Sequence, residues 1–171
     1  MGLIHIYHGT GKGKTTASLG LALRMAGKGE KVIFSQFLKC GDSHEIKALK
    51  ELKNVEILCC PKPHGFYIAL SDEERAEVKA ETVWLFEKIK GNGENASLIV
   101  MDEILDAVNL GLIKEEDLID FSIKQKQFSE IVLTGRNPSD NLREAADYIT
   151  NMEKEKHPFD KGLPARDGIE Y

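Results

Sequence analysis

Residues 3–16, LIHIYHGTGKGKTT, contain the pattern that decides the fold. Residues 3–7 form a short apolar run, which predicts a buried β-strand. Residues 14–28, KTTASLGLALRMAGK, are rich in alanine and leucine and are followed by a glycine, which predicts an α-helix. A glycine-rich loop therefore joins a strand to a helix, and this is the context in which a phosphate-binding loop (P-loop) occurs.

The chemistry of the loop favours an anion. Its glycines let backbone N–H groups turn inward, and the following helix directs the positive end of its dipole at the same point. We expect Lys14 to bring a cation to the phosphates and Thr15 to offer a hydroxyl to Mg2+. The predicted ATP site spans the whole loop: Gly9, Thr10, Gly11, Lys12, Gly13, Lys14, Thr15 and Thr16.

One position departs from the usual GxxxxGK[ST] pattern, because His8 stands where the first glycine is expected. We expect Gly9 to make the first bend in its place. The alternative is a strand–helix turn that binds no ligand. The spacing of Lys14 and Thr15 behind a strand argues against that alternative.

Apolar and amphipathic segments alternate along the rest of the chain. Strands are predicted at 31–37, 55–59, 98–101, 130–134 and 148–152, and helices at 43–52, from Ser71 onward, at 115–127 and at 139–146. The helix from Ser71 has a capping box with Glu74 and one apolar face, formed by Val78, Thr82, Leu85, Phe86 and Ile89. Strands that alternate with helices give a parallel sheet covered on both faces.

The predicted fold class is therefore α/β, a P-loop NTPase-like (RecA-like), mostly parallel sheet with helices on both faces. Residues 1–153 are expected to form the nucleotide-binding α/β domain. Residues 154–171 show no periodicity, and we expect them to be a C-terminal extension of the same domain.

Asp102 and Glu103 follow the most apolar of the predicted strands and match a Walker B acidic pair. Asp102 would hold Mg2+ directly or through water, because this ion prefers oxygen ligands and keeps several waters. Glu103 could be a second Mg2+ ligand, a ribose contact or a base for water. A solvated acidic turn is the alternative, but a P-loop needs an acidic partner.

The composition of the chain argues against some classes of binding partner. A formal net charge of -5 argues against nucleic acid or an anionic membrane as a partner, and no apolar run is long enough to span a bilayer. The N-terminus lacks the layout of a signal peptide. An odd number of cysteines, with no zinc-type spacing, fits a reducing compartment, so we expect a cytoplasmic protein.

With these motifs in view, the chain resembles the CobA-type ATP:corrinoid adenosyltransferases almost from end to end. The resemblance is carried by GTGKGKTTAS at 9–18, Arg24, SQFLK at 35–39, GF at 65–66, MDEI at 101–104, NLGLI at 109–113, LTGRN at 133–137, EAADYIT at 144–150 and KHPFDKGLPARDGIEY at 156–171. Members of that family also lack the first Walker glycine, which would account for His8.

The resemblance implies a reaction that the P-loop alone does not suggest. A Co(I) corrinoid attacks the 5′ carbon of ATP, the adenosyl group passes to cobalt, and triphosphate leaves. ATP would lie in the loop with reversed polarity relative to ordinary NTPases. Because the metal is the nucleophile, no general base is needed. Lys14, Thr15 and Glu103 are then the expected catalytic residues, with Glu103 a Mg2+ or ribose ligand.

Three further cations are expected to contact ATP. The resemblance implies that Arg24 neutralises phosphate, although a surface arginine near a helix end is the alternative. Lys39 and Arg136 lie just past predicted strand ends, where sheets of this type build their sites. Either of these two could instead be a plain loop cation.

On the corrinoid side, the resemblance implies that bulky apolar side chains displace the lower axial ligand of cobalt, so that a flavoprotein reductant can reduce Co(II). Phe66 and Tyr67 occupy the matching segment, with Ile68 where some members have tryptophan, and ordinary loop packing is the alternative. Longer members carry an extension before the first strand, and we expect its contact to be absent or replaced here.

The family also implies a homodimer and a role in adenosylcobalamin biosynthesis or salvage. A P-loop small-molecule kinase or NTPase is the alternative function. A non-catalytic regulator that binds nucleotide or corrinoid is a third.

Overall fold

The computed structural model describes residues 1–63, 65 and 67–169. Its centre is a sheet in which every neighbouring pair of strands is parallel, in the order β3-β2-β4-β5-β1-β6. The strands are β1 (Ile4–His8), β2 (Val32–Gln36), β3 (Val55–Cys59), β4 (Leu98–Asp102), β5 (Glu130–Gly135) and β6 (Tyr148–Asn151). The prediction of a mostly parallel sheet is thus confirmed, and the sheet is parallel throughout.

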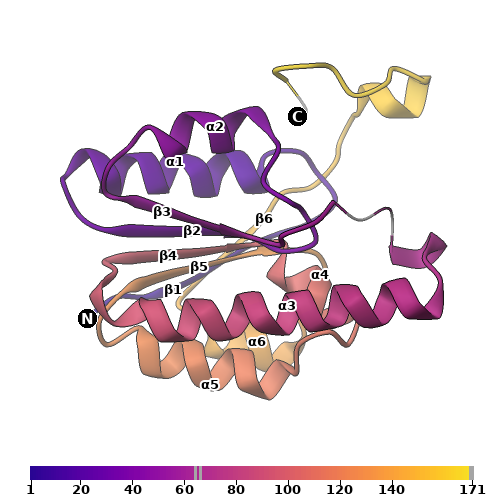
Figure 1. Cartoon of the computed structure of the whole chain (residues 1–171). Coiled ribbons are helices and arrows are strands. Elements are labelled where there is room, and N and C mark those ends of the chain that lie inside the picture. The colour runs from indigo at the N-terminus through magenta and orange to yellow at the C-terminus, as the bar shows by residue number, and fades with distance from the viewer. Residues whose placement is uncertain (64, 66, 170–171) are drawn as a thin grey trace.

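Helices cover both faces of the sheet, as predicted (Figure 1). One face carries α1 (Lys14–Gly27) and α2 (His44–Lys50); the other carries α3 (Asp72–Asn92), α4 (Ile104–Asn109), α5 (Glu115–Gln125) and α6 (Asp140–Ala145). Short 3-10 turns in the described part of the chain are η1 (Tyr67–Ala69), η2 (Gly93–Asn95) and η3 (Pro158–Lys161).

Two apolar layers hold the helices against the sheet. Every residue of β2 and β4 is buried, as expected for central strands of a parallel sheet that is covered on both faces. In α3 the buried residues are the five that the sequence assigned to one face. The predicted capping box is present as well: Glu74 N–H donates to Ser71 Oγ, and Ser71 N–H donates to Glu74 Oε2 at 2.7 Å.

The strand order decides where the site forms. β5 lies between β1, which precedes the P-loop, and β4, which precedes the acidic pair. Met101 pairs with Leu133, and Tyr7 pairs with Thr134, so the carboxyl ends of the three strands lie level with one another. The loop and the acidic pair therefore meet at one edge although their strands are not neighbours.

One helix is absent from the sequence prediction. α4 begins at Ile104, directly after the acidic pair, and is only six residues long. Such a segment is too short to show a helical repeat of apolar residues. The backbone turns from β4 into this helix through Glu103, whose φ of 61° no sequence rule for strands anticipates.

The C-terminal segment returns to the P-loop rather than packing on the core. Lys12 Nζ donates to the carbonyl of Ile169 at 2.9 Å, and His44 Nε2 lies 2.6 Å from Asp167 Oδ1. This segment projects from the upper right of the molecule in Figure 1, above the end of α3. Among the described residues, no helix is both long and apolar enough to cross a bilayer.

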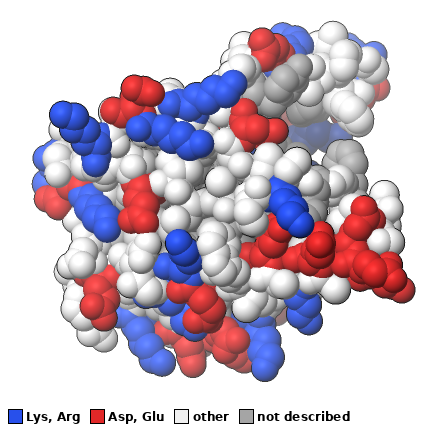
Figure 2. Space-filling view, in the orientation of Figure 1, with Lys and Arg blue, Asp and Glu red and all other residues white. Residues whose placement is uncertain are grey.

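Charges of both signs are mixed over most of the face in Figure 2, with a row of acidic side chains over the N-terminal part of α3. The first turn of that helix holds Asp72, Glu73 and Glu74. This acidic row would repel a triphosphate rather than attract it.

Candidate functional site

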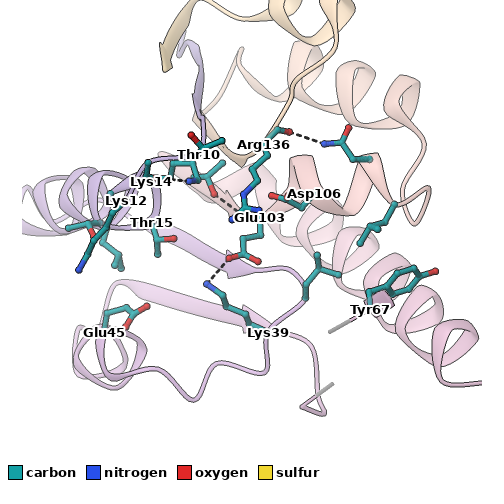
Figure 3. A pocket seen from close by; sticks show the side chains of 18 of the residues that line it. Thr10, Lys12, Lys14, Thr15, Lys39, Glu45, Tyr67, Glu103, Asp106 and Arg136 are labelled. Carbon is teal, nitrogen blue, oxygen red and sulfur yellow. Dashed lines mark hydrogen bonds and ion pairs between the residues drawn. The ribbon is translucent and has the colours of Figure 1, made fainter. Parts of the chain in front are cut away.

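A cavity of about 1210 Å³ opens at the carboxyl edge of the sheet. Its walls come from the P-loop, the segments after β2, β4 and β5, the region around η1, and the C-terminal segment. Figure 3 shows Lys14 and Thr15 on one side of this cavity and Tyr67 on the other. The fold thus brings the predicted phosphate site and the predicted aromatic segment to a single cavity.

The P-loop has the geometry that its glycines predict. Gly9 and Gly13 have φ values of 115° and 116°, in the region that favours glycine. Gly11 N–H donates to the carbonyl of Met152 at 2.7 Å, and a Cβ on Gly11 would lie only 2.7 Å from that same oxygen. The loop is therefore pressed against the chain just after β6, and a side chain at either Gly9 or Gly11 would displace it.

Lys14, the first residue of α1, curls back over the loop. Its Nζ donates to the carbonyls of Gly9 and Gly11, at 2.9 Å each. Burial, followed by the nearby positive charge of Arg136, lowers the pKa of this lysine. Lys14 is thus a cation positioned at the N-terminal end of a helix, where anions are favoured.

Asp102, at the end of β4, is fully buried and accepts hydrogen bonds from two hydroxyls. Thr15 Oγ1 lies 3.0 Å from Oδ1, and Thr134 Oγ1 lies 2.6 Å from the same oxygen. Burial raises the pKa of Asp102, while the charge of Lys39 and the Thr134 hydrogen bond oppose that rise. The P-loop threonine and the acidic residue predicted as its partner are therefore in direct contact.

Glu103 and Lys39 form the next layer of the site. Lys39 Nζ lies 2.8 Å from Glu103 Oε1 and 3.8 Å from Asp102 Oδ2, and Figure 3 shows Lys39 and Glu103 pointing toward each other. Burial alone would lower the pKa of Lys39, but the two carboxylates outweigh it and raise the pKa. Lys39 therefore offsets part of the negative charge of the acidic pair.

Backbone strain gathers at the same edge. Among the described residues, positive φ outside glycine occurs at Leu38, Glu103 and Asn137, with values of 60°, 61° and 45°. Each of these residues follows the end of a strand, and each lines the cavity. Such conformations cost on the order of 1–3 kcal/mol each and cluster at functional sites.

Arg136 and Asp106 lie beside each other in Figure 3 and complete the polar wall. Asn109 Nδ2 donates to the carbonyl of Arg136 at 2.8 Å, which fixes that backbone. Burial raises the pKa of Asp106, and the charge and backbone N–H of Arg136 oppose it. A Cβ on Gly135 would lie 2.6 Å from Asp106 Oδ2, so glycine is what allows this close approach.

Comparison with known proteins agrees with this geometry. The model of the family described as ATP:corrinoid adenosyltransferase BtuR/CobO/CobP matches residues 1–171. The chain belongs to this family. It is 34% identical to a corrinoid adenosyltransferase of Sinorhizobium sp, over 99% of this chain and 80% of that protein. It is 29% identical to the corrinoid adenosyltransferase CobA of Salmonella typhimurium, over 99% of this chain and 86% of that protein.

Most of the remaining residues predicted to bind ATP or the corrinoid also line this cavity. Thr10, Lys12 and Thr16 line the cavity with the rest of the loop, and Lys39 and Arg136 line it from the strand ends. Tyr67 lines it from η1, where the guanidinium of Arg75 lies 5.7 Å from the centre of its ring. Phe66 lies outside the described residues.

Arg24 is the predicted residue that the fold does not bring to the loop within one chain. It is exposed in the last turn of α1 and does not line the cavity. Ten residues of helix separate it from Lys14, which corresponds to a rise of about 15 Å. Burial and the charge of Glu130 raise the pKa of the Tyr7 phenol, and the charge of Arg24 only partly opposes that rise.

His8, which replaces the first Walker glycine, is the last residue of β1 and is buried. Its Nε2 has no hydrogen-bond partner among the described residues. Burial, then the charges of Arg143 and Lys14, lower the pKa of this imidazole, so the neutral form is favoured. The bend of the loop begins at Gly9, as predicted.

Sequence reasoning missed Thr134 and Asp106. Thr134 is the last residue of the strand predicted at 130–134, but in LTGRN only Arg136 was expected to contact ATP. Asp106 lies four residues after the end of β4, in α4, a helix that was itself not predicted. The signal for both residues was a position at or just past the end of a strand, which is informative only once neighbouring strands are known.

Proposed function

We propose that this chain transfers the 5′-deoxyadenosyl group of ATP to the cobalt of a Co(I) corrinoid and releases triphosphate. The observation that carries the proposal is a single cavity that joins a P-loop to an apolar wall. At about 1210 Å³ it exceeds the roughly 300–1,000 Å³ of common small-molecule sites. A cavity of this size supports the binding of two substrates side by side.

The bond changes follow from the substrates. A cobalt–carbon bond forms as the 5′ carbon–oxygen bond breaks, and the electron pair of the broken bond leaves with triphosphate. Negative charge grows on the departing ester oxygen, and preorganised cations and N–H groups stabilise such charge. Lys14, the inward N–H groups of the loop and the N-terminus of α1 supply these groups. Holding the 5′ carbon opposite cobalt supplies much of the remaining rate enhancement.

Glu103 is proposed as a ligand rather than a base. Its carboxylate already pairs with Lys39 at 2.8 Å, and the reaction removes no proton from a nucleophile. Lys39 and Arg136 are proposed to contact ATP from the strand ends that line the cavity. Arg24 remains a proposed phosphate contact because of the family resemblance. Within one chain it lies on the surface and does not line the cavity.

We further propose that Mg2+ accompanies ATP. Thr15, Asp102 and Glu103 offer one hydroxyl and two carboxylates, the oxygen donors that this ion prefers. Among the described residues, no group of three or more His, Cys, Asp or Glu side chains could hold a metal. This fits an ion held by one or two carboxylates together with substrate phosphates. When bound, Mg2+ would neutralise charge on the leaving triphosphate.

The apolar wall is the proposed corrinoid side. Tyr67, Ile68 and Leu110 line the cavity away from the P-loop, and Ile68 is 85% exposed. Together with Phe66 they are proposed to displace the lower axial ligand of cobalt, so that a flavoprotein can reduce Co(II). Cobalamin and cobyrinic acid diamide are the two corrinoids that we would compare.

The C-terminal segment, 154–171, is proposed to belong to the same domain as 1–153 and to cover the nucleotide. The contacts of Ile169 with Lys12 and of Asp167 with His44 support this role. We also propose a homodimer, as the family implies. A cytoplasmic location is proposed because the three cysteines are free thiols, at Cys40, Cys59 and Cys60.

The products of the reaction test the proposed function. The chain is incubated with ATP, Mg2+ and chemically reduced Co(I) cobalamin, and formation of the cobalt–carbon bond is followed by absorbance. We expect one triphosphate for each bond formed. Release of phosphate or ADP without that bond would instead establish an NTPase or kinase. Binding of both substrates with no turnover would indicate a regulator.

Replacing Phe66 with alanine tests the corrinoid side. We expect a large loss of activity when Co(II) cobalamin and a flavoprotein reductant are supplied, and little loss when Co(I) is supplied directly. The reason is that displacing the axial ligand matters only for reduction. The matched control is Phe128→Ala, since Phe128 is 67% exposed and does not line the cavity. Equal activity of the Phe66 variant in both assays would remove Phe66 from this role.

A further inference from the structure

We propose that Thr134 is a positioning residue that sets the two carboxylates of the acidic pair relative to each other. It joins the side chain of Asp102 to the backbone of Glu103 through a single hydroxyl. This role deepens the proposed function, because it concerns the same ATP and Mg2+ site. It can be tested separately, because binding of ATP and Mg2+ can be measured without a corrinoid.

The sheet puts Thr134 where it can do this. It is the last residue but one of β5, the strand adjacent to β4, and its side chain is completely buried. Met101 pairs with Leu133, so the next residues, Asp102 and Thr134, come side by side at the carboxyl edge. No other strand lies between the hydroxyl and the acidic pair.

The hydroxyl uses both of its capacities. Its proton is donated to Asp102 Oδ1 at 2.6 Å, and its oxygen accepts the N–H of Glu103 at 2.9 Å. The first distance is typical of a charge-assisted bond between a hydroxyl and a carboxylate. One side chain therefore orients a buried carboxylate and holds the peptide from which the second carboxylate projects.

Glu103 needs that support because its backbone is strained. With φ at 61°, the residue turns out of β4 and starts α4, and its carboxylate enters the cavity to meet Lys39. A non-glycine residue in this conformation persists only when its surroundings determine it. The bond from its N–H to Thr134 is a contact made at the strained residue itself.

Two hydroxyls donate to Asp102, and only that of Thr134 has no expected role in binding Mg2+. Thr15 donates to Asp102 at 3.0 Å, but its hydroxyl is the one that would bind Mg2+ together with nucleotide. Gln36 Nε2 lies 3.5 Å from Oδ2, at the limit of a hydrogen bond. Thr134 is then the hydroxyl that keeps the carboxylate of Asp102 in its orientation.

The test compares Thr134→Val, which removes the hydroxyl at constant shape, with Thr134→Ser, which retains it. The readout is the Mg2+ concentration that gives half of the ATP-dependent rise in thermal midpoint. Removing a group that orients a metal ligand costs about 10- to 100-fold in metal affinity. We expect Thr134→Val to raise that concentration by such a factor and Thr134→Ser to restore the parent value.

Thr82→Val is the matched control. Thr82 is also fully buried, and its hydroxyl donates to the carbonyl of Val78 at 2.7 Å, within α3 and away from the cavity. We expect this variant to lose thermal stability without any change in the Mg2+ concentration. An equal shift in the Thr82 and Thr134 valine variants would reduce Thr134 to a structural residue.

The role of Thr134 would also be overturned by an unchanged Mg2+ concentration in Thr134→Val, or by a serine variant that behaves like the valine variant. Absence of any Mg2+ dependence in the parent chain would overturn it too. If the parent chain makes no cobalt–carbon bond but Thr134→Val shifts the Mg2+ concentration, the proposed function fails and the role of Thr134 stands.

Discussion

Replacing Lys14 with alanine is expected to abolish measurable ATP binding and to lower adenosyl transfer by about 10²- to 10³-fold, the range for losing one preorganised donor at a site of developing charge. The lysine is held over the loop by two carbonyls and lies at the start of α1. It is therefore in place before the substrate arrives, and no other side chain of the loop occupies that position. Calorimetric titration with ATP and a turnover assay measure the two effects.

The control for the loss of Lys14 is Lys28→Ala, which removes the same charge at the other end of α1. Lys28 Nζ pairs with Glu30 at 3.1 Å on the surface and does not line the cavity. We expect this variant to bind ATP like the parent chain. A Lys14 variant that bound ATP normally would exclude the P-loop as the triphosphate site.

The second large effect is expected for Asp102→Asn. Asparagine preserves the shape of the side chain but removes the charge that would face Mg2+, so transfer should fall by at least the roughly 100-fold that losing a supporting group of a metal site costs. The folded chain should not be destabilised at neutral pH, because the buried carboxylate is itself costly to keep ionised. Turnover and urea unfolding test the two halves of this prediction.

The raised pKa of Asp102 also predicts how the stability difference between the asparagine variant and the parent chain changes with pH. Burial raises the pKa of Asp102 in the folded chain, so above that pKa the unfolded chain holds the ionised form more readily and folding is weakened. The weakening is complete above the folded pKa and shrinks as the pH falls from there toward the unfolded pKa. We therefore expect the difference in unfolding free energy between the asparagine variant and the parent chain to be positive at neutral pH and to narrow in acid. A gap that widened in acid would contradict this account.

Much of the fold could be predicted because its elements carry local signals. The apolar runs that became β2 and β4 are buried on both sides, and the spacing in α3 identified its buried residues. The P-loop was equally local, since its glycines and Lys14 form one continuous stretch. α4 was not predicted because a helix of six residues is too short to show a helical repeat of apolar positions.

The residues of the candidate site could be predicted only in part. Motif spacing identified Lys14, Thr15, Asp102 and Glu103, and all four meet at one edge. It could not show that Lys39 pairs with Glu103, because 64 residues separate them along the chain. Nor could it separate Arg24 from Arg136, since both are arginines near element ends and only one lines the cavity.

The sequence by itself therefore determined the alternation of strands and helices, the anion-binding loop and the family. These depend on neighbours along the chain, whose chemistry is visible in the letters. Only the tertiary structure decided that β5 lies between the two motif-bearing strands, and with it that Thr134 contacts both members of the acidic pair. The physical reason is that contacts between strands depend on their order in the sheet, which no local pattern of residues encodes.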